Sequence, residues 1–117
     1  PTRRSSDLKA FSKAVADFQN TRFRLADMAT TVDVMWAYID RAMLLYKDAK
    51  LSAEEAAKVK FWATEREWDV LDACVQLHGG YGFMNEYRVA RAWKDARVHK
   101  IWAGTNEIMK EVIGRAL

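Results

Sequence analysis

Residues 76–115 read QLHGGYGFMNEYRVARAWKDARVHKIWAGTNEIMKEVIGR and contain two glycine turns, at residues 79–82 (GGYG) and 103–105 (AGT). Glycine commonly ends helices because, without a Cβ, it adopts left-handed backbone angles at no steric cost. Asparagine and threonine commonly begin helices because their side chains accept hydrogen bonds from the free amides of the first turn. The stretch therefore predicts a helix that ends with Gly79 in the left-handed conformation, a short helix capped by Asn85, and a last helix capped by Thr105.

Before this stretch, apolar residues recur at alternating spacings of three and four, which is typical of one stripe on a long helix. The stripe consists of Leu25, Met28, Val32, Met35, Ile39, Ala42 and Tyr46. We expect this helix over residues 17–47, with Asp17 as its N-cap and the polar residues 47–50 at its end.

A second long helix is predicted over residues 52–77. Ser52 and Glu55 form a capping box, in which each side chain accepts from the backbone amide of the other. The expected inner-face residues are Ala56, Val59, Ala63, Val70, Ala73 and Leu77 in this helix, Val89, Ala92, Trp93 and Ala96 in the third, and Ile108, Val112 and Ile113 in the fourth. No segment has a convincing strand pattern and the connections are short, so we predict an all-α, four-helix up-down bundle.

The composition argues against several classes of function, among them a basic nucleic-acid-binding bundle, which is the second alternative. The net charge is +3 and the basic residues alternate with acidic ones, whereas a nucleic-acid-binding bundle gathers Lys and Arg on one face. No apolar run is long enough to span a bilayer. A lone cysteine, Cys74, forms no disulfide framework and is interpreted as a core residue in a reducing compartment. No metal site is predicted, because Val75 and Ala96 stand where the Glu-x-x-His pattern of di-iron bundles needs glutamates before His78 and His99.

Residues 1–8, PTRRSSDL, back-translate to CCT ACA CGA CGC TCT TCC GAT CT, which resembles the end of a widely used short-read sequencing adapter. We interpret them as an assembly artefact, expect them to be disordered and to pack against nothing, and assign the domain to residues 9–117. The alternative is a natural basic tail.

Three motifs resemble the C-terminal helical domain of the acyl-CoA dehydrogenases, the flavoenzymes that desaturate acyl thioesters. The motifs are residues 9–19 (KAFSKAVADFQ), 76–80 (QLHGG) and 102–107 (WAGTNE). Two departures weaken the first motif, because Leu8 stands at the usual arginine and Ser12 at the usual glycine. The resemblance covers residues 9–117 and implies that the first helix of this domain, the middle β-domain and the N-terminal helical domain are missing here.

The resemblance implies FAD as the cofactor. In the family, the first two motifs contact FAD bound mainly by a neighbouring subunit, and the Gly-Thr turn lies beside the flavin. The implied cofactor-binding residues are Phe11, Phe18, Gln19, Gln76, Leu77, His78, Gly79, Gly80, Thr105 and Glu107. The implied substrate-binding residues are Trp102, Ala103 and Gly104. Glu107 has a second interpretation as a capping carboxylate in the first turn of a helix, and His78 as a hydrogen-bonded structural histidine.

Ala103 departs from the family pattern, because medium- and short-chain members carry their catalytic glutamate at this position. A methyl group cannot abstract a proton, so no catalytic residue is predicted in this chain. In the long-chain and isovaleryl branches the glutamate comes from the preceding helix, which would lie before Lys9. The resemblance therefore implies a parent enzyme of such a branch, and an inactive isolated chain.

The implied reaction of the complete enzyme is oxidation of the α,β carbon–carbon bond of an acyl-CoA in fatty acid β-oxidation, by proton abstraction and hydride transfer to the flavin. The implied partners are an electron-transfer flavoprotein or similar acceptor and further copies of the full-length protein in a homotetramer. The expected location is the bacterial cytoplasm, or the mitochondrial matrix in a eukaryote. The competing hypothesis is a non-catalytic helical interaction module, which has no need of two glycine turns in this pattern.

Overall fold

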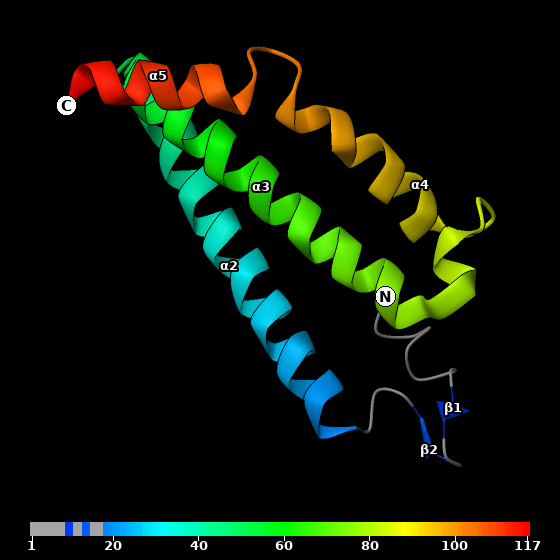
Figure 1. Cartoon of the computed structure of the whole chain (residues 1–117). Helices are drawn as coiled ribbons and strands as arrows, with labels where there is room; N and C mark the ends of the chain where they lie inside the picture. Colours follow the sequence, from blue (N-terminus) through cyan, green and yellow to red (C-terminus); the bar gives the residue numbers. More distant parts are fainter. Residues whose placement is uncertain (1–8, 11–12, 15–17) are drawn as a thin grey trace.

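The computed structural model describes residues 9–10, 13–14 and 18–117, and the described chain is dominated by four α-helices (Figure 1). They are α2 (Gln19–Lys47), α3 (Ala53–His78), α4 (Arg88–Ala96) and α5 (Asn106–Ala116). Two short 3₁₀ helices, η2 (Gly79–Phe83) and η3 (Arg97–Lys100), flank α4. The predicted all-α fold with two long and two short helices is therefore confirmed. The interpretation of residues 1–8 lies outside the described residues.

A minimal hairpin precedes the helices and was not predicted. Its strands are β1 (Lys9–Ala10) and β2 (Lys13–Ala14), which pair antiparallel with Lys9 opposite Ala14. Backbone groups pair in this way without an alternating apolar pattern, so sequence periodicity carries no signal of it.

Helix α3 occupies the centre of the fold and packs against α2, α4 and α5 (Figure 1). A short connection joins α2 and α3, which lie side by side and antiparallel. Figure 1 shows that α4 and α5 follow one another along α3, because η3 continues in the direction of α4. The first turn of α2 therefore lies toward the same end of the molecule as the last turn of α3.

Helix α2 ends in a Schellman motif at an alanine. Ala49 has a φ of 56°, its amide donates to Tyr46 O (3.0 Å), and the amide of Lys50 donates to Leu45 O (2.8 Å). The start of α2 differs from the prediction: Phe18 is the N-cap residue and provides no side-chain cap. The predicted cap, Asp17, lies outside the described residues.

The other predicted caps have mixed outcomes. Ser52 Oγ accepts from the Glu55 amide (3.1 Å), but the Glu55 carboxylate accepts from the Ser52 hydroxyl and from Arg41 Nη2 (3.1 Å), so only half of the box is confirmed. Thr105 caps α5 as predicted, with Oγ1 accepting from the Ile108 amide (3.3 Å).

The prediction that Asn85 caps the third helix is wrong. Helix α4 begins at Arg88 after Tyr87, which provides no side-chain cap. The backbone carbonyl of Asn85 instead accepts from Arg91 Nη1 (2.8 Å). Because η2 extends the preceding turn to Phe83, the helix begins later than the asparagine suggested.

Small side chains form the tightest part of the core. Its buried apolar residues are Ala42, Ala57, Cys74, Leu77, Ala90 and Ala96. Ala57 is buried and the predicted Ala56 is exposed, and Ile108 of α5 is also exposed. The prediction that Cys74 is a core residue is confirmed: the thiol is buried against Met28, and burial raises its pKa.

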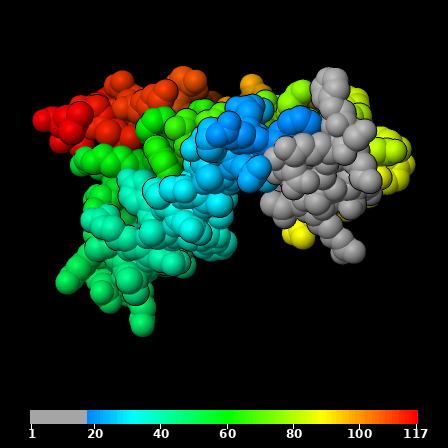
Figure 2. Space-filling model, turned by 90° about the horizontal axis from the view of Figure 1, so that it is seen from below, coloured from blue at the N-terminus to red at the C-terminus, as the bar shows by residue number. Residues whose placement is uncertain are grey.

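The predicted stripe of α2 is only partly covered, because among the described helices α2 packs chiefly against α3. Val32 and Tyr46 of the stripe are exposed. Figure 2 shows the corner between α2 and α3 (cyan-green) projecting from the rest of the molecule. The exposed large apolar residues of α2 are Phe23, Val32, Val34, Trp36, Met43, Leu44 and Tyr46.

Candidate functional site

The predicted site residues fall into two groups at opposite ends of the α4–η3 segment (Figure 1). Residues 83–102 separate the two turns, and the nine residues of α4 and four of η3 within them rise by roughly 20 Å along the segment. Phe18 and Gln19, at the start of α2, lie toward the same end as residues 76–80 (Figures 1 and 2). The structure therefore separates the predicted Gly-Thr site from the other described cofactor residues. Phe11 lies outside the described residues.

The second turn exposes an unusual backbone. Ala103 has a φ of 54° and Gly104 a φ of 89°, and only glycine adopts such angles without strain. A Cβ on Gly104 would lie 2.7 Å from Met109 Cε. Trp102 is 57% exposed beside them, and Glu107 is exposed in the first turn of α5. The turn thus presents backbone, one indole and one carboxylate to the surface at a helix N-terminus.

Beneath this turn lies a polar cluster that the sequence analysis missed. Asn106 is 2% exposed, and its Nδ2 donates to Thr64 Oγ1 (3.0 Å) and Glu65 Oε1 (2.9 Å) of α3. Lys60 Nζ donates to the carbonyl of Gly104 (2.8 Å) and to Asn106 Oδ1 (2.6 Å). The only sequence signal of the cluster is the pair of polar residues at positions 60 and 64. They lie one helical turn apart, next to positions that were expected to form an apolar face.

The cluster contains charges of both signs, because the Glu65 carboxylate lies with the ammonium groups of Lys60 and Lys100. Glu65 Oε2 accepts from Lys100 Nζ (3.1 Å), so one carboxylate is bonded to residues on both sides of the turn. The hydrogen bond from Asn106, followed by the contact with Lys100, lowers the pKa of Glu65 despite partial burial. Partial burial lowers the pKa of the Lys60 ammonium, because removing water disfavours its charged form.

His99 adds an aromatic contact to the same turn. Its ring stacks on Trp102 with centroids 5.1 Å apart and an interplanar angle of 21°. His99 Nδ1 lies 2.7 Å from Glu67 Oε2, which holds the ring orientation. From the sequence, His99 was considered only as a metal ligand. Within the described residues, no three His, Cys, Asp or Glu side chains form a metal-binding group.

The first turn is built around His78, which is buried. Its Nδ1 lies 2.7 Å from the carbonyl of Cys74, which requires Nδ1 to carry the proton. Among the other predicted residues here, Leu77 is buried and Gln76 is exposed. A hydrogen-bonded structural histidine therefore describes the side chain of His78.

The glycines of the first turn differ from one another. Gly79 has φ 63° and ψ −146°, so the predicted left-handed cap is wrong: this is an extended mirror-image conformation that is essentially restricted to glycine. A Cβ on Gly79 or Gly80 would meet only open space. A Cβ on Gly82 would lie 2.5 Å from Val75 O and 2.9 Å from His78 Cβ, so Gly82 packs against α3.

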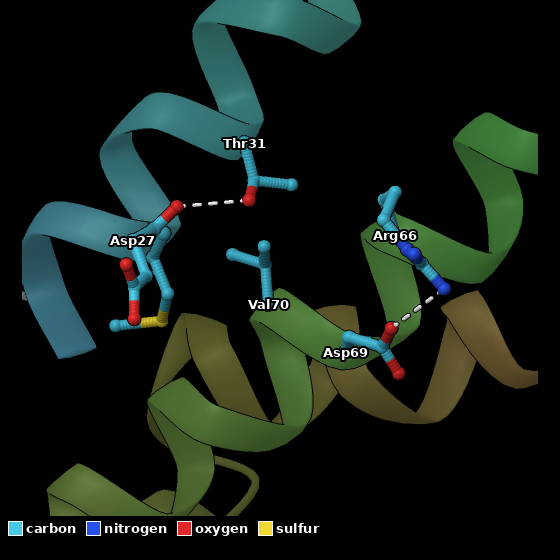
Figure 3. Close-up of a pocket in the computed structure, with 6 residues that line it drawn as sticks. Asp27, Thr31, Arg66, Asp69 and Val70 are labelled. Atoms are coloured by element: carbon cyan, nitrogen blue, oxygen red, sulfur yellow. Dashed lines mark hydrogen bonds and ion pairs between the residues drawn. The ribbon is translucent and has the colours of Figure 1, made fainter.

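A shallow pocket of about 230 Å³ lies between α2 and α3 (Figure 3) and contains none of the predicted site residues. Arg66 pairs with Asp69 (3.1 Å) at its edge, and Thr31 donates to the carbonyl of Asp27 (2.8 Å). Arg66 Nε is buried and has no hydrogen-bond partner among the described residues. The pocket is therefore separate from both glycine turns.

The model of the acyl-CoA dehydrogenase C-terminal domain matches residues 2–117. The chain belongs to the acyl-CoA dehydrogenase family. It is 45% identical over 109 residues to the mitochondrial long-chain specific acyl-CoA dehydrogenase of Rattus norvegicus, covering 93% of this chain and 25% of that protein. It is 37% identical over 113 residues to CarC, a subunit of the caffeyl-CoA reductase-Etf complex of Acetobacterium woodii, covering 97% of this chain and 30% of CarC.

Solved structures of the family have the same fold. An acyl-CoA dehydrogenase from Geobacillus kaustophilus matches with a TM-score of 0.93 and 40% identity, covering 98% of this chain and 30% of that one. The butyryl-CoA dehydrogenase of Megasphaera elsdenii matches with a TM-score of 0.92 and 33% identity, covering 98% of this chain and 30% of that one. This chain spans about a quarter to a third of the length of these relatives and corresponds to their C-terminal helical domain.

Proposed function

We propose that this chain is the C-terminal part of an FAD-dependent acyl-CoA dehydrogenase that oxidises the α,β bond of an acyl-CoA. The observation that supports this best is the coincidence of a family match over residues 2–117 with two exposed glycine turns in backbone conformations that favour glycine. The relatives with the highest identity quoted above are dehydrogenases, although CarC belongs to a reductase complex, so we favour the oxidative direction.

The surfaces around both turns fit a dinucleotide cofactor. Gly79 and Gly80 have open space where a Cβ would point, so a phosphate group could approach their backbone closely. We propose that residues 76–80, with Phe18 and Gln19, contact FAD that is bound mainly by a neighbouring subunit. We further propose that Thr105 and Glu107 contact FAD at the other turn, where the helix N-terminus favours anionic groups. Bound flavin would supply the hydride acceptor.

The proposed role of this chain is to orient the acyl group and to exclude water from the acyl pocket. Trp102, Ala103 and Gly104 are proposed to line the acyl pocket, with the Trp102 indole supplying apolar surface. Ala103 cannot act as a base, so we propose that a glutamate on the helix preceding this chain removes the α proton. The small Ala103 side chain would leave room for that carboxylate. Burial would have to raise its pKa toward neutrality for efficient proton abstraction.

The proposed partners follow from the family. The caffeyl-CoA reductase-Etf complex includes CarC, and one matched structure is described as an electron transferring flavoprotein of Acidaminococcus fermentans, so an electron-transfer flavoprotein is the proposed acceptor. The exposed apolar residues of α2 fit burial within a larger homotetrameric enzyme. None of the described helices has both the length and the apolar composition needed to cross a bilayer. We propose the bacterial cytoplasm, or the mitochondrial matrix in a eukaryote, as the location.

The test uses the complete protein, recovered from the DNA upstream of this chain. Purified protein should carry FAD, and anaerobic addition of an acyl-CoA should bleach the flavin absorption. This chain alone should show no dehydrogenase activity. A complete protein that binds no flavin would favour the helical interaction module. A flavoprotein that no acyl-CoA reduces would refute the proposed substrate class.

The relocated base has its own test in the complete protein. Replacing the upstream glutamate by glutamine should abolish flavin reduction by acyl-CoA while FAD remains bound. Adding Ala103→Glu to that variant should restore part of the activity, because the two carboxylates would reach the same α proton. An upstream helix with no acidic residue facing the flavin would refute the relocated base.

A further inference from the structure

The turn at residues 101–105 combines an exposed surface with an unusually well-anchored backbone. Ala103 has a positive φ, which is strained for a residue with a Cβ. Such conformations persist when the surrounding structure holds them in place, and they concentrate at functional sites. Here the holding groups come from α3, which is distant in sequence, rather than from the turn itself.

Three side chains of α3 anchor the turn and its flanks: Thr64 accepts a neutral hydrogen bond from Asn106 (3.0 Å), and Lys60 and Glu65 make the charged contacts. Lys60 Nζ donates to the Gly104 carbonyl inside the turn (2.8 Å), and to Asn106 Oδ1 (2.6 Å) just after it. Glu65 accepts from Lys100 before the turn (3.1 Å) and from Asn106 after it (2.9 Å). The turn is therefore attached to one rigid helix before, within and after its strained residues.

The contacts are of the kind that resists displacement. Hydrogen bonds with a charged partner are stronger than neutral ones, and each of these four has a charged donor or acceptor. Asn106 is 2% exposed, so a movement of the turn would leave its amide unpaired in the interior. Thr105 adds a local cap, because its hydroxyl accepts from the Ile108 amide of α5. Lys60 and Glu65 thus determine where the turn lies relative to α3.

We propose that Lys60 and Glu65 are positioning residues, which hold the Ala103–Gly104–Thr105 backbone in the place required for cofactor and substrate contact in the complete enzyme. This inference rests on the proposed function, because it assigns a purpose to the turn. Neither residue is required to touch FAD or acyl-CoA; each acts through Gly104 or Asn106.

The test compares lysines two positions apart in α3 of the complete protein. Lys60→Met removes the bonds to the turn and keeps an unbranched side chain of similar length. Lys58→Met is the matched control, because Lys58 pairs with Glu54 on the same helix, away from the turn. Lys60→Arg keeps a charged donor. Glu65→Gln keeps an acceptor for Asn106 but removes the charge that Lys100 contacts, and serves if Lys60→Met folds poorly.

Two readouts separate positioning from ordinary stabilisation. Hydrogen exchange measured by mass spectrometry should be about tenfold faster in the peptide containing residues 101–105 for Lys60→Met, and unchanged there for Lys58→Met. The Kd for FAD should rise about tenfold in Lys60→Met, with Lys60→Arg within about threefold of the unmodified protein. Glu65→Gln should shift both readouts in the same direction.

Three results would overturn the inference: unchanged exchange at the turn, faster exchange with unchanged FAD affinity, or equal effects of Lys58→Met and Lys60→Met. A complete, unsubstituted protein that binds no FAD would refute the proposed function itself, and the cofactor-positioning role with it. A protein that binds FAD but shows no difference between the two lysine variants would refute only the positioning role.

Discussion

Two turns of this chain contain an alanine in the left-handed region, and different interactions hold them. Ala49, after α2, has a φ of 56°, and Ala103, before α5, has a φ of 54°. The Ala49 turn is closed by backbone hydrogen bonds to Leu45 and Tyr46 only a few residues away. The Ala103 turn is attached by side chains of α3 that lie more than 40 residues earlier in the chain.

The difference shows how the same local strain serves two purposes. At Ala49, the conformation completes a helix cap, and its cost is offset by the backbone bonds of that cap. At Ala103, distant charged side chains hold the conformation in a predetermined place. Local hydrogen bonds therefore suffice to end α2, whereas the second turn is also bonded by side chains of another helix.

The largest expected effect is the loss of the buried amide below the second turn. Asn106→Ala would leave Lys60 and Glu65 without a shared partner, and we expect a loss of about 3 kcal/mol in unfolding free energy. Urea unfolding of the complete protein measures it. Asn85→Ala is the control: Asn85 is exposed and bonds Arg91 through its backbone, so its effect should stay below about 0.5 kcal/mol. Similar losses in both variants would mean that the cluster does not anchor the turn.

The next effect separates the glycines of the first turn. Gly82→Ala would place a Cβ against the Val75 backbone, and we expect a destabilisation of about 2 kcal/mol. Gly80→Ala meets open space and should change the unfolding free energy by less than about 0.5 kcal/mol. If Gly80 approaches a phosphate, this variant should still weaken FAD binding in titrations. A large loss of stability in Gly80→Ala would contradict the open space around that residue.

A smaller effect tests the two alanines directly. Glycine relieves the strain of a positive φ, so Ala49→Gly and Ala103→Gly should each raise the unfolding free energy by about 1 kcal/mol. Thermal unfolding of both variants provides the measurement. If the Ala103 turn is positioned for function, Ala103→Gly should also speed hydrogen exchange at residues 101–105. A gain at Ala49 with a loss at Ala103 would show that the alanine methyl group itself stabilises the second turn.

The smallest effect is the pH dependence that Glu65 contributes. Its pKa is lowered in the folded protein, chiefly by Asn106, so the folded state binds this proton less readily than the unfolded state. The stabilisation is therefore fully present above about pH 4.3, the ordinary glutamate value, and is lost as the pH falls through the lowered folded-state pKa. Unfolding measured between pH 7 and pH 3 should lose less stability in Glu65→Gln than in the unsubstituted protein, by under about 1 kcal/mol. A steeper acid loss in Glu65→Gln would contradict this sign.

Much of the fold could be predicted because its signals are local. The three-and-four spacing in α2, the Ser52 cap and the Thr105 cap all act within a turn or two of helix, and the structure has each of them. The predictions are wrong where packing against neighbouring elements determines where a helix begins or which of its residues are buried. Asn85 is a good helix start in isolation, but η2 extends the preceding turn and delays α4. Ala57 is buried instead of Ala56, because the rotation of α3 is set by the helices packed around it.

The candidate site likewise has a part that local motifs indicated and a part that only the packed structure shows. Glycine and threonine in short motifs indicated both turns, and the resemblance to the family supplied their proposed roles. Lys60 and Glu65 were not predicted, because nothing in their local pattern connects them to a turn about 40 residues later. His99 was considered only as a metal ligand, whereas the structure stacks it on Trp102.

By itself, the sequence determined the four helices, the side-chain caps of α3 and α5 and the positions of the two glycine turns, since backbone geometry and capping depend on neighbouring residues. Only the tertiary structure decided which α-helical residues are buried, how far apart the two turns lie, and which side chains hold the second one. Those outcomes depend on the packing of α3 against α2, α4 and α5, because charged groups from separate elements meet only after the helices have packed.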